Sequence, residues 1–168
     1  IKRTTDFGGV IKNLLPNTSY QIRCRRIGWC PNKWITTIPV VIRSGPGVPG
    51  SPRALTAKEV SSESILLTWN VPEKDNGLPV IEYIVHMKPY GGNFTQVYQG
   101  KERCFLSSNL QSNIVHVFQI QALNRVGKSI MSDRLACRTL PPGAASLSPW
   151  VEVIDERSHK LFYCHTKT

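Results

Sequence analysis

The sequence lacks the patterns of membrane-spanning, zinc-binding and common catalytic proteins. No run of about 18 or more apolar residues is present, so no segment has the length of a transmembrane helix. Its four histidines are scattered, and no P-loop, dinucleotide fingerprint, G-x-S-x-G or H-E-x-x-H pattern occurs. We therefore expect no catalytic residues, no cofactor and no metal site. Hydrophobic residues make up 40% of the 168-residue chain, which is enough for a packed core.

Cysteines are few and odd in number, and none forms a C-x-x-C pair or a Cys/His zinc spacing. We predict free, mostly buried thiols in a reducing compartment, which favours an intracellular location. Two N-glycosylation triplets, beginning at Asn17 and Asn93, point the other way. The cysteines are Cys24, Cys30, Cys104, Cys137 and Cys164.

Acidic residues are scarce at the start of the chain. Residues 1–48 hold eight Lys or Arg against a single acid, Asp6, and the whole chain carries a formal net charge of +10. A basic segment attracts acidic proteins, sulfated sugars, phospholipid or nucleic acid, whereas a merely solvated sheet face is the alternative. A polyanion is thus one partner to test.

Period-two alternation dominates the middle of the chain, and no segment sustains a helical period. Clusters of Pro and Gly at 44–52 and 140–143 predict linkers on either side of a stretch about as long as one β-sandwich. We therefore predict an all-β protein. The side chains expected in its core are Leu55, Ile65, Leu67, Trp69, Tyr83, Val85, Phe118, Ile120 and Ala122.

An internal repeat relates the first part of the chain to the middle. The segment 14–24 matches 110–120, so that Tyr20 corresponds to His116, 96 residues later. That offset is about the length of one sandwich domain. We expect the first 43 residues to be the back half of a copy whose front half is missing.

The pattern Leu-x-Pro-x-Thr-x-Tyr, from Leu14 to Tyr20, resembles the E–F corner of fibronectin type III domains. The second copy resembles that family along its whole length, including Leu67-Thr68-Trp69 and the segments 72–83 and 122–129. The resemblance implies a seven-stranded Greek-key sandwich. His116 stands where the family has its corner Tyr, and we expect it to bond backbone upstream more weakly.

An aromatic–basic cluster follows the first corner. The cluster consists of Arg23, Arg25, Trp29, Lys33 and Trp34. The segment that holds it loosely resembles the Trp-Ser-x-Trp-Ser box of cytokine-receptor sandwiches. Guanidinium groups stacked on indole rings stabilise such a box. Structural stacking and a binding epitope are the two interpretations that the sequence leaves open.

The tail from Pro149 to Thr168 resembles the first two strands of a WW domain, with a Trp followed twelve residues later by an aromatic pair. The resemblance implies that Phe162, Cys164 and Thr166 would line a groove for Pro-rich peptides once a third strand completed it.

The predicted organisation is an array of binding modules. Residues 1–44 are the C-terminal half of a fibronectin type III-like domain, 45–51 a linker, 52–140 a complete domain, 141–148 a linker and 149–168 a truncated WW-like module. We expect a protein–protein interaction segment of a scaffold or adaptor. An adhesion or receptor ectodomain and a regulatory arm of a larger enzyme are the alternatives.

Overall fold

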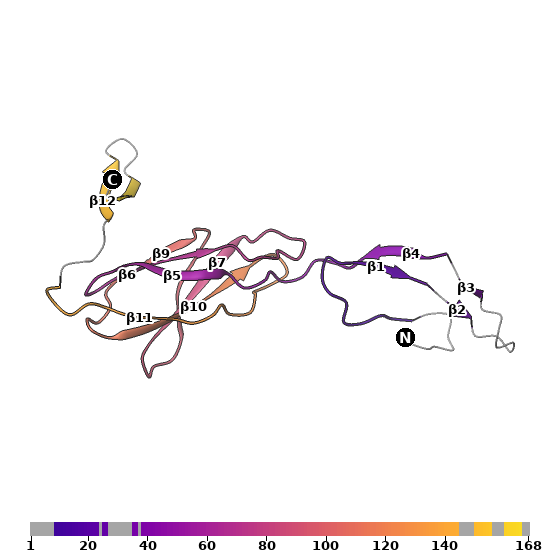
Figure 1. Cartoon of the computed structure of the whole chain (residues 1–168), viewed down its shortest axis with the longest axis horizontal. Coiled ribbons are helices and arrows are strands. Elements are labelled where there is room, and N and C mark those ends of the chain that lie inside the picture. Colours follow the sequence, from indigo (N-terminus) through magenta and orange to yellow (C-terminus); the bar gives the residue numbers. More distant parts are fainter. Residues whose placement is uncertain are drawn as a thin grey trace.

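The computed structural model describes residues 9–23, 25–26, 35–36, 38–144, 150–155 and 160–165, and it describes only the backbone of 25–26, 35–36, 150–155 and 160–165. All regular structure in these ranges is β-strand (Figure 1). The described residues include no helix of the length and apolarity that crossing a membrane requires. The predicted all-β class is confirmed.

Seven strands form an antiparallel sandwich. One sheet has the order β5-β6-β9, from Arg53–Val60, Ile65–Asn70 and Cys104–Ser107. The other has the order β11-β10-β7-β8, from Leu135–Arg138, Val115–Leu123, Glu82–Pro89 and Thr95–Gly100. The chain crosses between the sheets after β6, after β8 and after β9, as the predicted Greek-key sandwich requires.

The core lies between the two sheets and contains the nine predicted side chains, with Leu55 at its edge. Alternation places Ile65, Leu67 and Trp69 on the inner face of β6, where the first two are fully buried. The Trp69 ring forms T-shaped contacts with Tyr83 and Tyr98, with ring centroids 5.7 and 6.2 Å apart. The structure adds Leu110, which the alternation did not predict because it lies outside a strand.

The two described thiols lie on opposite sheets. Cys104 begins β9 and Cys137 lies in β11, and both are free. Burial raises the pKa of Cys137. The expectation of mostly buried thiols is wrong for Cys104, which is exposed because its neighbour Phe105 takes the inward position on β9.

Three further strand pairs lie outside the sandwich. Strand β1 (Ser19–Ile22) pairs with β4 (Val40–Arg43), and β2 (Arg25–Arg26) pairs with β3 (Ile35–Thr36). Near the C-terminus β12 (Trp150–Asp155) pairs with β13 (Lys160–His165), so the predicted C-terminal hairpin is present.

Candidate functional site

In the corner before β1 and in the corner before β10, a ring side chain contacts the backbone five residues upstream. The backbone N–H of Leu15 donates to Tyr20 Oη at 2.7 Å, and His116 Nε2 lies 3.5 Å from the carbonyl oxygen of Gln111. Each contact spans five residues, and the two are 96 residues apart. His116 thus bonds the backbone upstream more weakly, as predicted, although its partner is a carbonyl oxygen and that of Tyr20 is an N–H.

A hydroxyl group closes each corner in the same way. Ser44 Oγ donates to the Leu15 carbonyl at 2.6 Å and accepts from the Thr18 N–H at 2.9 Å. Thr139 Oγ1 donates to the Gln111 carbonyl at 2.6 Å and accepts from the Ile114 N–H at 3.1 Å. Left-handed asparagines also recur at the 96-residue offset, in the pairs Asn13 and Asn109, and Asn17 and Asn113.

The segment between the first corner and the sandwich is held by loops at one end of the sandwich. Gly47 N–H donates to the Asn76 carbonyl at 3.0 Å, and Asn76 Nδ2 donates to the Val48 carbonyl at 2.7 Å. Asn124 Nδ2 donates to the Gly47 carbonyl at 2.9 Å, while its Oδ1 accepts from Val126 and Gly127. These bonds anchor the linker to two loops of the sandwich.

Two glycines let the first corner approach the sandwich closely. A Cβ on Gly77, whose φ is +93°, would lie 2.8 Å from Asn17 Cγ. A Cβ on Gly47 would lie 2.6 Å from Pro16 Cβ, well inside normal contact. Glycine is therefore needed at both positions for this approach. We call the contacts of Pro16 and Asn17 with Gly47, Gly77 and the linker the joint.

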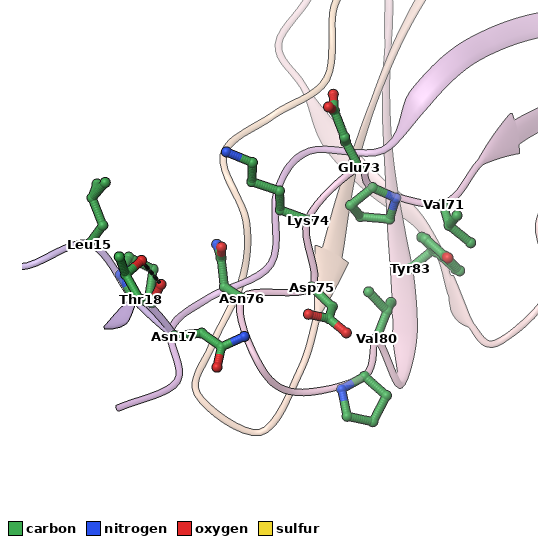
Figure 2. Close-up of a pocket in the computed structure, with 13 residues that line it drawn as sticks. Leu15, Asn17, Thr18, Val71, Glu73, Lys74, Asp75, Asn76, Val80 and Tyr83 are labelled. Atoms are coloured by element: carbon green, nitrogen blue, oxygen red, sulfur yellow. Dashed lines mark hydrogen bonds between the residues drawn. The ribbon is translucent and has the colours of Figure 1, made fainter. Parts of the chain in front are cut away.

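An open pocket of about 910 Å³ lies at the joint. Figure 2 shows Leu15, Asn17 and Thr18 on one side of it and the loop from Val71 to Val80 on the other. Its acidic side chains have structural roles: Asp75 Oδ1 accepts from the Gly77 N–H at 2.9 Å, and Glu73 pairs with Arg53 at 3.4 Å. The described residues contain no cluster of three metal-ligating side chains.

A model of the fibronectin type III domain matches residues 50–138, which cover the sandwich and its last strand. The chain belongs to the fibronectin type III family. Domains of this fold typically serve as non-catalytic binding modules, and the predicted sandwich is confirmed.

Relatives place this fibronectin type III chain among modular proteins. It is 29% identical over 169 residues to mouse fibronectin type III domain containing protein 3C1, with 96% of this chain covered, and 29% identical over 161 residues to rat netrin receptor DCC, with 90% covered. It spans only 12% and 11% of those proteins. The crystal structure of titin domains A168–A170 matches with a TM-score of 0.55 and 26% identity over 61% of this chain and 36% of that one.

The two predicted binding clusters are described only in part. Arg23 is exposed directly after β1, and Arg25 lies in β2, whereas Trp29, Lys33 and Trp34 lie outside the described residues. Phe162 and Cys164 lie two apart on β13, opposite Val153 and Val151, and Thr166 lies outside the described residues. Both clusters therefore stay predictions.

Sequence reasoning missed a group on the outer face of the four-stranded sheet. Lys88 Nζ lies 5.1 Å from the centroid of the Phe94 ring, and Arg134 Cζ lies 5.9 Å from it. The three residues come from β7, the turn before β8 and the segment before β11. In the sequence, this group is indicated only by Arg134 and Arg138, two basic residues four positions apart.

Proposed function

We propose that this chain is a protein–protein interaction segment of a larger scaffold or adaptor, in which fibronectin type III modules are held at a defined angle. The observation that carries the proposal is the joint. Its linker is hydrogen-bonded at Gly47 and Val48, and its corner packs on glycines that leave no room for a side chain. Two modules joined by a flexible linker would need neither the hydrogen-bonded linker nor the glycines at the contact.

In this proposal residues 1–44 are the C-terminal half of another fibronectin type III domain, joined by 45–51 to the domain at 52–140. The recurrence of the corner bonds and left-handed asparagines at the same offset supports it. The apolar face of β1 and β4 supports it too, since Val40 and Ile42 are 59% and 40% exposed. Ile22 corresponds to Phe118, which is fully buried in the complete sandwich.

The tail is proposed as the start of a WW-like module, with 141–148 as its linker. The β12–β13 hairpin has the two strands that such a module begins with. Two strands alone are marginal in water, so binding of Pro-rich peptides would need a third strand. Extending the chain by one strand should restore binding through Phe162, Cys164 and Thr166, measured by Trp fluorescence. No change with Pro-rich peptide would refute this part.

A receptor ectodomain is the second candidate, favoured by the likeness to netrin receptor DCC and by the exposed sequon at Asn93. The other sequon residue, Asn17, packs against Gly77 in the joint. Against this candidate, we propose a reducing, intracellular location on the strength of the free thiols at Cys104 and Cys137. Localisation of the tagged full-length protein, together with sensitivity to glycosidase, distinguishes the two compartments.

Cross-linking mass spectrometry on the full-length protein in cells tests the interaction function. We expect cross-links from the lysines of the sandwich to a recurrent set of partner proteins. Cross-links that stay within the chain in every condition would contradict the proposal.

A further inference from the structure

One end of the four-stranded sheet carries cations and aromatic rings on its outer face. Lys88 lies opposite Val117 on β10, and Arg138 lies opposite Val115. Tyr90 N–H donates to the Val115 carbonyl, which brings Tyr90 into the row of Arg138. We call this surface the aromatic–cationic face and define it by Lys88, Tyr90, Phe94, Arg134 and Arg138.

The cations of this face are held in place before any partner arrives. Lys88 and Arg134 both lie within 6 Å of the Phe94 ring, at 5.1 and 5.9 Å from its centroid. Arg138 Nη1 donates to the Asn113 carbonyl at 2.8 Å. Side chains that are already ordered lose less conformational entropy on binding.

No carboxylate neutralises these cations within the part of the chain that the structure describes. The ion pair between Arg53 and Glu73 lies elsewhere on the sandwich. Asp133 is the acid closest to Arg134 in sequence, but it is exposed and forms no ion pair with Arg134. The face therefore presents positive charge to solvent and is complementary to an anion.

A hollow of about 280 Å³ marks one point of the face. It is lined by Tyr90, Asn113, Ile114, Val115 and Arg138. Its walls combine an aromatic ring and aliphatic side chains with a guanidinium group, and Tyr90 beside it is 82% exposed. A guanidinium binds a carboxylate in a fixed fork, while the ring and aliphatic groups cover the stem of the acidic side chain.

We propose that the aromatic–cationic face binds an acidic segment of a partner protein, with one acidic side chain in the hollow against Arg138 and a second beside Lys88, Arg134 and Phe94. This inference rests on the proposed interaction function and names its surface and the chemistry of the partner. Aromatic residues and Arg are the types enriched at protein interfaces. A nucleic acid or sulfated chain would call for a denser row of cations than three residues separated by Val115, Val117 and Ala136.

The test uses the whole 168-residue chain labelled with ¹⁵N and two synthetic decapeptides, one alternating Glu and Thr and the other alternating Gln and Thr. We expect the Glu peptide, at up to about 2 mM, to shift the amides of 86–90, 115–119 and 134–138, and the Gln peptide to leave them unchanged. Arg138→Gln and Lys88→Gln should each weaken binding by about fivefold or more. Lys58→Gln removes the same charge from exposed β5 on the other sheet and should change binding by less than about twofold.

Phe94→Leu removes the ring but no charge, and it should weaken binding while the melting curve shows that the sandwich still folds. Equal shifts from the two peptides, no shifts at all, or an equal loss in Lys58→Gln would overturn the inference. So would a heparin fragment or DNA duplex that binds more tightly with the same dependence on Arg138. Cross-links from a partner that map to another surface of the sandwich would refute the face and leave the interaction function standing.

Discussion

Replacing the two glycines of the joint by alanine should loosen it, and the chain provides a matched control for each change. Gly77 and Gly91 both have positive φ, +93° and +79°, but only Gly77 faces the first corner, since nothing lies within 4 Å of a Cβ on Gly91. Gly47 faces Pro16, whereas a Cβ on Gly45 meets nothing within 4 Å. Each pair therefore separates the contact at the joint from the backbone effect of alanine.

The expected magnitudes follow from these geometries. Gly91→Ala should cost about 1–2 kcal/mol, the strain of a left-handed alanine. Gly77→Ala carries the same strain, and its Cβ would lie 2.8 Å from Asn17 Cγ, an overlap worth about 1–3 kcal/mol if the corner stayed in place. Gly45→Ala should stabilise by up to about 1 kcal/mol by restricting the unfolded chain. Gly47→Ala should lose that gain, because the ring of Pro16 is rigid and lies 2.6 Å away.

We expect the joint to open rather than accept the overlap, because the corner can withdraw without disturbing the core of the sandwich. Residual dipolar couplings of the whole chain measure this: residues 14–22 and the sandwich should share one alignment tensor in the unaltered protein and in the Gly45→Ala and Gly91→Ala variants. In the Gly47→Ala and Gly77→Ala variants, the alignment tensor of residues 14–22 should differ from that of the sandwich. Separate tensors in the unaltered protein, or the same behaviour of Gly77→Ala and Gly91→Ala, would refute the reasoning.

Three further predictions concern the sandwich. Trp69→Ala should cost about 3–5 kcal/mol in denaturant unfolding. Trp69→Phe should cost much less, because the buried indole Nε1 has no hydrogen-bond partner among the described residues. An unchanged midpoint for Trp69→Ala would contradict the core. Thr139→Val removes the hydrogen bonds to Gln111 and Ile114 and should lower the free energy of unfolding by about 1–3 kcal/mol. Thr56→Val, at an exposed position, should lower it by less than about 0.5 kcal/mol. Equal losses in the two variants would show that the corner bonds add no stability. Cys137 should be alkylated more slowly than exposed Cys104, because burial raises the pKa of Cys137 and so lowers its thiolate fraction at neutral pH; its alkylation should become faster as pH rises. Mass spectrometry of partly alkylated protein ranks the two cysteines. Faster alkylation of Cys137 than of Cys104 would contradict the prediction.

Local patterns were sufficient to predict most of the sandwich. The inner face of a strand follows from period two, so Ile65, Leu67 and Trp69 were identified as core residues from their spacing alone. The resemblance to the fibronectin type III E–F corner predicted the corner contact of His116, which closes within five residues of chain as that of Tyr20 does. Where the pattern was not strand-like, as at Leu110, the prediction was incomplete.

What the sequence determined by itself was the class of fold, the family resemblance and the strands that carry the core, because these depend on residues close together in the chain. Only the tertiary structure decided that Asn17 lies against Gly77 and that Phe94 lies under both Lys88 and Arg134. Asn17 and Gly77, like Phe94 and Arg134, are far apart in sequence, and no periodicity relates a loop to a distant strand. The physical reason is that the joint and the aromatic–cationic face are created by packing between elements, and the side chains that meet there carry no local signal of one another.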